Sequence, residues 1–162
     1  MPAFQQPVRF KGIQVLTLLR ISAGKKLSIS EACEYLSEVG LCARDYINRE
    51  VNASLSGGEL KRIEIATVMA RAARLTVFDE PEAGIDLWSF RNLIRIFEGM
   101  RSNIRDSSMV IISHQERILK IADEIAVLSN GQIEQQGPRE EILPCVIGTA
   151  SAQDACSRLM KE

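Results

Sequence analysis

The 162-residue sequence lacks several features that would point directly to a functional class. Its longest apolar stretches, such as "IQVLTLL", are far shorter than the ~20 residues of a membrane-spanning helix. The N-terminus has no charged segment followed by an apolar one, as a signal peptide would. Twenty basic and twenty-one acidic residues leave a net charge of −1, so no basic field favours nucleic acid. We therefore expect a soluble, cytoplasmic protein that binds no nucleic acid.

Closely paired cysteines are also missing. The four cysteines form no C-x-x-C pair, and their spacing matches no common zinc or cluster pattern; they are Cys33, Cys42, Cys145 and Cys156. This pattern indicates ordinary reduced thiols of a cytosolic protein. The remaining composition, 46% apolar and 25% charged, is ordinary for a globular domain and leaves the fold class open.

The first third of the chain predicts a loop followed by helices. Prolines, glutamines and a glycine make residues 1–12 a loop, and a helix is expected near Ile13–Ser22. Ser30 is a good N-cap for the next helix, "EACEYLSEV", and Gly40 lies just beyond its end. A short helix over Ala43–Arg49 completes a small all-helical segment.

Beyond "LSGG", helices alternate with short apolar strands, which predicts parallel βαβ units and an α/β fold. The expected elements are a helix over Glu59–Arg74, a strand over Leu75–Phe78, a helix over Leu87–Arg101, a strand over Met109–Ile112, a helix over Gln115–Ala122 and a hairpin turned at Asn130-Gly131. The helix over Leu87–Arg101 is expected to be capped by Asp86. Its inward-facing side chains are expected to be Leu87, Phe90, Ile94 and Phe97. The tail, residues 145–162, predicts only a short helix.

The stretch "LSGGELKR", residues 55–62, has the pattern of a helix start that can bind an anion. Ser56-x-x-Glu59 also matches a capping box, in which the two side chains satisfy backbone donors of the first turn. A helix N-terminus stabilises an anion by about 0.3–1 kcal/mol, rising to ~2 in favourable sites. Even a millimolar complex needs about 4.1 kcal/mol, so this turn cannot hold a nucleotide by itself.

Two adjacent carboxylates follow the apolar run "LTVF". Asp79 and Glu80 should lie at the carboxyl edge of the parallel sheet, where α/β proteins bind ligands. Adjacent residues leave a strand in opposite directions, so in a nucleotide hydrolase one can hold the magnesium shell while the other activates water. The alternative is a pair that merely starts a loop before Pro81. His114, the only histidine, follows the next strand and is expected at the same edge, unless its role is structural.

This order of motifs strongly resembles the ATP-binding cassette (ABC) ATPases. "LSGGE" (residues 55–59) resembles their signature, "LTVFDE" (75–80) their Walker B motif, "AGID" (83–86) their D-loop, Ser113-His114 their H-loop and "AFQQP" (3–7) their Q-loop. The resemblance runs from about Gln5 to Leu143. It implies a partial P-loop NTPase fold with a parallel sheet, a C-terminal hairpin and a small α-helical subdomain. The implied segments are a Q-loop segment (1–12), the helical subdomain (13–54), the signature helix and α/β core (55–144) and the tail (145–162).

The resemblance also implies ATP and Mg²⁺ as cofactors and a head-to-tail dimer with a second cassette, identical or different. The resemblance assigns catalysis to Glu80, His114 and Gln5. It assigns the binding of Mg²⁺, which comes with ATP, to Asp79 and Gln5. The residues implied to contact ATP are Leu55, Ser56, Gly57, Gly58, Glu59, Asp79 and Asp86. In the family, the signature turn closes over the γ-phosphate of the nucleotide that the second cassette holds.

One family element is absent from the sequence, which contains no G-x-x-x-x-G-K-S/T phosphate loop. At the only Gly-Lys pair, Gly24-Lys25, Leu19 replaces the first glycine and Lys26 replaces Ser/Thr. We therefore predict that the 162-residue chain by itself neither binds nor hydrolyses ATP measurably. Parallel sheets normally have both faces and both edges covered, and in the family the phosphate-loop strand and its helix contribute to that cover. Without them, we also expect an exposed apolar surface, a bare sheet edge and self-association.

Within the family, "AFQQPVRFKGI" and "SGGELKR" look most like the cytosolic ATPase of the SUF iron–sulfur assembly system, whose partners are soluble scaffold proteins. The alternative is the ATP-binding subunit of an ABC transporter, which would couple to a membrane permease through the helical subdomain. A further alternative is a non-catalytic, truncated cassette that lends its signature turn to a complete partner.

Overall fold

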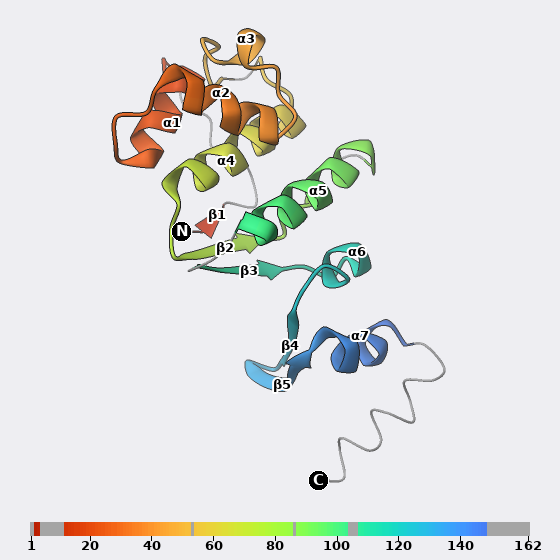
Figure 1. The fold of residues 1–162 in the computed structure, drawn as a ribbon. Helices are drawn as coiled ribbons and strands as arrows, with labels where there is room; N and C mark the ends of the chain where they lie inside the picture. The colour runs from red at the N-terminus through yellow and green to blue at the C-terminus, as the bar shows by residue number, and fades with distance from the viewer. Residues whose placement is uncertain (1, 4–11, 53, 86, 104–106, 149–162) are drawn as a thin grey trace. The chain divides into compact units, whose positions relative to one another are not determined.

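The computed structural model describes residues 2–3, 12–52, 54–85, 87–103 and 107–148 (Figure 1). The chain divides into two compact units, Met1–Ser113 and His114–Glu162, which are described separately. Within the described ranges, no helix combines the length and apolar character needed to cross a membrane.

The first unit opens its helical part with α1 (Val15–Ala23), α2 (Ile29–Glu38) and α3 (Ala43–Tyr46). Ser28 caps α2: its Oγ accepts from Glu31 N at 3.2 Å, and the Glu31 carboxylate accepts from Ser28 N at 2.9 Å. The prediction of Ser30 as the cap is wrong. Ser28 has a glutamate three residues later and can form a reciprocal capping box, whereas Ser30 has Cys33 there.

Helix α4 (Gly57–Arg71) is the packing centre of the helical part, and α1 and α2 contact it (Figure 1). The core of this helical part is mainly apolar; its members include Val15, Leu19, Leu27, Ala32, Leu36, Val39, Leu60 and Ile63. The helix ends before the predicted Arg74, because Ala72 adopts a left-handed conformation with φ of 49°.

The sheet of the first unit has three parallel strands in the order β1–β2–β3: β1 (Pro2–Ala3), β2 (Leu75–Asp79) and β3 (Ser108–Ile112). The predicted parallel arrangement of the two apolar strands is confirmed. The prediction of a loop throughout residues 1–12 is wrong at Pro2 and Ala3, which pair with Val77 and Phe78. Two residues carry no readable periodicity, and proline is accepted at the first position of a strand.

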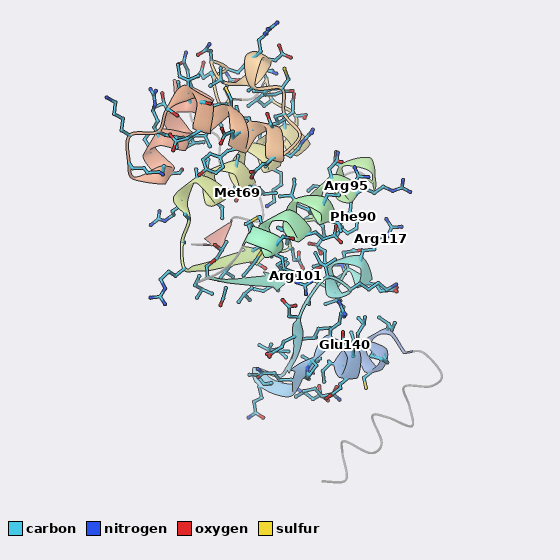
Figure 2. All side chains as sticks on the ribbon, in the orientation of Figure 1. Met69, Phe90, Arg95, Arg101, Arg117 and Glu140 are labelled. Atoms are coloured by element: carbon cyan, nitrogen blue, oxygen red, sulfur yellow. The ribbon has the colours of Figure 1, made fainter. Side chains whose placement is uncertain are left out.

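Helix α5 (Leu87–Asn103) has a buried stripe formed by Phe90, which Figure 2 labels, Leu93, Ile96 and Phe97. The Phe97 ring lies 5.0 Å from that of the fully buried Phe78 in β2, at an interplanar angle of 59°. The predicted inward set is confirmed at Phe90 and Phe97, but Ile94 is only half-buried. The side chain of Leu87 lies outside the described residues.

The sheet also carries apolar side chains that are exposed. Leu75 in β2 and Val110 and Ile112 in β3 are 52%, 46% and 52% exposed. Leu75 and Ile112 alternate with the buried Thr76 and Phe78 in the strand register, so they belong to the opposite face of the sheet. The expectation of an exposed apolar surface on the sheet is confirmed.

The second unit contains α6 (Glu116–Leu119), the hairpin strands β4 (Glu124–Ser129) and β5 (Gln132–Pro138), and α7 (Arg139–Ile147). The predicted hairpin is confirmed, with Asn130 and Gly131 both at positive φ (50° and 78°). Ile142 of α7 is buried and packs beside Gly137 of the hairpin. Residues 149–162 of the predicted tail lie outside the described residues.

The cysteines agree only in part with the expectation of reduced thiols. Cys33 and Cys42 are free. Cys145 is disulfide-bonded, so the expectation is wrong for this residue.

Candidate functional site

The turn that starts α4 is closed by a complete capping box, as the sequence predicts. Ser56 is extended, its Oγ accepts from Glu59 N at 3.2 Å, and Glu59 Oε2 accepts from Ser56 N at 2.6 Å. Gly57 and Gly58 are the first two helical residues, so their N–H groups have no carbonyl four residues back within the helix. These two N–H groups are the donors that the turn can offer to an anion.

The two glycines leave open space at this turn. A Cβ built on Gly57 would meet nothing within 4 Å, and one on Gly58 would meet only Ser89 Oγ of α5, at 3.8 Å. Neither residue has a positive φ that would demand glycine. The fold of the free chain does not require glycine here, whereas close approach of a ligand to the backbone would.

Glu59 makes further contacts beyond the capping box. The Tyr46 hydroxyl donates a hydrogen bond to Glu59 Oε1, and Arg49 Nη1 lies 3.6 Å from the same oxygen. The Tyr46 hydrogen bond is the main cause that lowers the pKa of Glu59 from 4.5 to about 2, and the Ser56 backbone N–H contributes. The same bond raises the pKa of Tyr46. Glu59 is therefore an ionised carboxylate held from two sides.

Sequence reasoning missed Tyr46 and Arg49. Tyr46 ends α3 and Arg49 lies in the loop after it, and only the fold shows that both reach the first turn of α4. A second link also joins these parts, because Arg62 donates from Nε to Gly58 O at 3.2 Å and from Nη1 to Gly40 O at 3.4 Å. The helical part and the turn are thus connected by several polar contacts.

The carboxylate pair lies where the sequence predicts, at the carboxyl end of β2. Asp79 is the last residue of the strand and pairs in register with Ile112 of β3. Glu80 follows with φ of 40°, an uncommon value for a residue other than glycine, and its N–H donates to Ile112 O at 2.9 Å. Such strained backbone is concentrated at functional sites, so the geometry of Glu80 fits a catalytic position.

Glu82 is a buried carboxylate that the sequence did not single out. Its exposure is 9%, and its Oε1 accepts a hydrogen bond from Ser113 Oγ at the end of β3. Its Oε2 is also buried and has no hydrogen-bond partner among the described residues. The turn is further closed by Ala83 N donating to Glu80 O at 3.0 Å and Ile85 N to Glu82 O at 3.1 Å. The sequence gives no sign of this burial, because an acidic residue in a turn is normally solvated.

Lys61 is a second buried charge. It is 2% exposed, and its Nζ lies 3.3 Å from Glu64 Oε2 one turn further along α4.

In the ranges that the structure describes, no group of three or more His, Cys, Asp or Glu side chains is arranged to hold a metal ion. The expected role of Asp79 toward Mg²⁺, which the sequence places through ATP, stays a prediction.

The other predicted site residues are placed as follows. Leu55 is buried, at 2% exposure, directly before the turn. His114 opens the second unit, where its Nε2 lies 3.3 Å from Gln115 Nε2. Gln5 and Asp86 lie outside the described residues. The roles of these four residues toward ATP stay predictions.

Comparisons with known proteins agree with these motifs. The family model described as "ABC transporter" matches residues 3–83, which is half of the chain. An uncharacterized ABC transporter ATP-binding protein of Methanocaldococcus jannaschii is 32% identical over 146 residues, covering 86% of this chain and 58% of its own length. An energy-coupling factor transporter ATP-binding protein of Mycoplasma pneumoniae is 33% identical over 126 residues, or 76% of this chain and 40% of its own.

The fold is similar to that of a solved protein described as a dimeric bacterial ABC transporter cassette. The TM-score is 0.71 at 19% identity, over 85% of this chain and 62% of the other. This likeness confirms the predicted α/β cassette fold, while the chain spans only about half the length of the relatives it matches. From the matched half and the shared fold together, we conclude that the chain belongs to the ABC transporter family of ATP-binding cassettes.

Proposed function

We propose that the chain supplies the signature turn and the hydrolytic carboxylates of an ATP-hydrolysing ABC cassette. One observation carries the proposal: a single unit combines an anion-ready turn at Ser56–Gly58 with the Asp79–Glu80 pair at the carboxyl end of a parallel strand. Donors for the γ-phosphate and a carboxylate that can position the attacking water are two components that ATP hydrolysis uses together with a phosphate-binding loop and Mg²⁺.

Each residue then has a defined role. Gly57 and Gly58 N–H groups, with the Ser56 hydroxyl, donate to the γ-phosphate of a nucleotide held by a second cassette. Asp79 holds the Mg²⁺ shell, together with Gln5, and Glu80 orients or deprotonates the attacking water. Asp79 and Gln5 would hold Mg²⁺, which when bound would supply charge neutralisation for the transferring phosphate.

The residues of this chain fit ATP and Mg²⁺ in part. The Asp79 carboxylate is a hard oxygen ligand of the kind that Mg²⁺ prefers, and the N–H groups of the turn suit a phosphate. The cradle for the β- and γ-phosphates is not in these 162 residues, which have no G-x-x-x-x-G-K-S/T motif. The roles of Asp86 and His114 toward ATP follow from the family motifs alone.

The partner that the relatives support best is a membrane permease. The Methanocaldococcus and Mycoplasma relatives are both named as transporter ATP-binding proteins. In this reading the helical part, residues 13–54, contacts the permease, and the cassette dimer works at the cytoplasmic face of the membrane. A permease that co-purifies with the protein would support it.

A second candidate rests on residues of this chain. "AFQQPVRFKGI" and "SGGELKR" favour the SUF iron–sulfur assembly ATPase, whose partners are soluble scaffold proteins. Co-purification with a soluble scaffold, and no permease, would favour this candidate. A third candidate is a cassette that lends its turn to a complete partner and hydrolyses nothing itself; a heterodimer with hydrolysis at only one of its two sites would support it.

The test compares two proteins. One is the 162-residue chain; the other, here called the completed cassette, carries the phosphate-loop segment of a full ABC cassette ahead of this sequence. We expect calorimetry to detect ATP binding, and a phosphate-release assay to detect turnover, only for the completed cassette. A completed cassette that is folded, binds ATP and still gives no turnover would contradict the proposed catalytic role and favour the third candidate.

A further inference from the structure

Three side chains, from the end of α3, the loop after it and the first turn of α4, form a polar cluster. Glu59 is the centre: Tyr46 and Arg49 contact its Oε1, and Ser56 N donates to its Oε2. The Arg49 guanidinium also lies 5.0 Å from the centroid of the Tyr46 ring, within cation–π range. Both carboxylate oxygens are therefore engaged, one by the helical part and one by the turn.

Arg49 is itself anchored by the backbone of the helical part. Its carbonyl accepts from Val15 N of α1 at 2.9 Å, and its N–H donates to Tyr46 O at 2.9 Å. The Tyr46 hydroxyl donates to the same carboxylate that accepts from Ser56 N. A shift of α3 or α1 would therefore move Glu59 and with it the backbone of the turn. The cluster connects the helical part to the turn mechanically.

The cluster also decides what the first turn can offer to a phosphate. A carboxylate near a helix N-terminus is attracted to the same N–H groups as an incoming anion and competes with it. Glu59 is fixed by Tyr46 through one oxygen and by Ser56 N through the other. While it is fixed in this way, it cannot turn toward the N–H groups of Gly57 and Gly58.

We propose that Tyr46 and Arg49 are positioning residues that hold the Glu59 carboxylate, keep the Gly57 and Gly58 N–H groups available, and so set the turn for the γ-phosphate. This inference rests on the proposed function for its phosphate, and it adds that the helical part controls the turn through these two side chains. Neither residue contacts the nucleotide; both act through Glu59.

The first test uses the 162-residue chain and hydrogen exchange of the Ser56 amide. Tyr46→Phe removes only the hydroxyl, and Tyr35→Phe is the matched control, because Tyr35 is the only other tyrosine and lies in α2. We expect Tyr46→Phe to speed exchange at Ser56 at least about fivefold, the lower end of typical coupling between sites. Tyr35→Phe should leave it unchanged. Equal exchange in the wild type and Tyr46→Phe would overturn the proposal.

The second test is a double-mutant cycle in the completed cassette. Tyr46→Phe should lower kcat/KM for ATP at least about fivefold without changing the dissociation constant for the nucleotide on its own phosphate loop. Arg49→Gln should act in the same direction. In a Glu59→Ala background, Tyr46→Phe should have no further effect, since it acts through that carboxylate. An equal loss in both backgrounds would overturn the proposal.

The two tests separate the proposal from the proposed function. If the completed cassette shows no turnover, the catalytic function fails, and amide exchange in the 162-residue chain still decides whether Tyr46 holds the turn. If turnover is normal and Tyr46→Phe changes neither readout, the proposed function stands and the positioning role is excluded.

Discussion

Ser113, at the end of β3, donates a hydrogen bond to the buried carboxylate of Glu82, in the turn that follows β2. The bond joins residues 31 positions apart and fixes the turn beside Glu80 to the neighbouring strand. Together with Glu80 N donating to Ile112 O, it sets the chain path immediately after the two carboxylates. The carboxyl edge of the sheet is therefore built by contacts that do not involve a nucleotide.

Glu82→Ala should destabilise the protein by about 1.5–3 kcal/mol, the range for a hydrogen bond to a charged group. Glu82→Gln should cost less, because the amide keeps an oxygen that can accept from Ser113 while removing a charge whose Oε2 is buried. Urea unfolding of the 162-residue chain measures both. Glu134→Ala, at an exposed position of β5, is the control. If it lowered the free energy of unfolding as much as Glu82→Ala does, the stabilising role of the Glu82–Ser113 hydrogen bond would be contradicted.

Stability at acid pH should depend on Glu59. Its pKa is lower in the folded chain, about 2, than its ordinary 4.5, so the ionised form favours the folded state. This stabilisation is complete above pH 4.5 and disappears as the pH falls through about 2. Tyr46→Phe should therefore destabilise the chain at pH 7 and progressively less from pH 4.5 to 2, because Tyr46 is the main cause of the low pKa.

Thermal unfolding of Tyr46→Phe and wild type across this pH range gives the measurement. Arg49 and Arg62 also face this cluster, but both keep their charge throughout, so they do not produce the pH dependence. Glu31, whose pKa is lowered by its hydrogen bonds to Ser28, is present in both proteins and therefore cancels in the difference. A difference that stays constant from pH 7 to 2 would exclude Glu59 as the partner.

Which features of the fold and the site can be predicted from the sequence depends on how far apart along the chain the interacting residues are. The capping box at Ser56 and Glu59 is predicted because its partners are three residues apart and its chemistry is local. Strand β2 and the position of Asp79 and Glu80 are predicted because a buried parallel strand is a continuous apolar run. Local pattern is sufficient for these features.

The other features of the site depend on contacts between residues far apart in the sequence, which no rule of local spacing predicts. Tyr46 contacts Glu59 across 13 positions and Ser113 contacts Glu82 across 31, so only the folded chain shows either pair. The prediction of the α2 N-cap is wrong by two residues because Ser28 and Ser30 both fit the cap, and only the full box identifies Ser28. The short strand at Pro2–Ala3 carries no pattern of its own and forms only by pairing with β2.

The signature glycines should show opposite effects on stability and on activity. Gly57→Ala places a Cβ in open space at a helical position, so it should stabilise the free chain by about 0.4–1 kcal/mol. In the completed cassette the same Cβ occupies the approach to the Gly57 and Gly58 N–H groups and should reduce ATP turnover. Gly99→Ala, also in open space but in α5, is the control: it should stabilise the chain and leave turnover unchanged. A Gly57→Ala cassette with full turnover would remove the turn from the phosphate site.

The exposed apolar residues of the sheet should cause self-association. Val110 and Ile112 are 46% and 52% exposed on a strand that, among the described residues, pairs only with β2. Val110→Thr keeps β-propensity and shape while adding a hydroxyl, so it should weaken association in sedimentation velocity. Ile21→Thr removes an apolar group that is 65% exposed in α1 and should change association less. A wild-type chain that sediments as a clean monomer would contradict this expectation.

Glu80 is the residue whose substitution most directly tests the chemistry. In the completed cassette, Glu80→Gln should reduce turnover by about 10²–10⁴-fold, the usual contribution of a general base, and leave ATP binding intact. The change keeps the side-chain shape, so the positive φ and the bond from Glu80 N to Ile112 O should persist and stability should stay within about 0.5 kcal/mol. Glu98→Gln, at an exposed position of α5, is the control. Because Glu82 is two residues away and buried, Glu82→Gln must be assayed beside it: if that variant loses turnover while Glu80→Gln does not, the base is Glu82 and the role assigned to Glu80 is wrong.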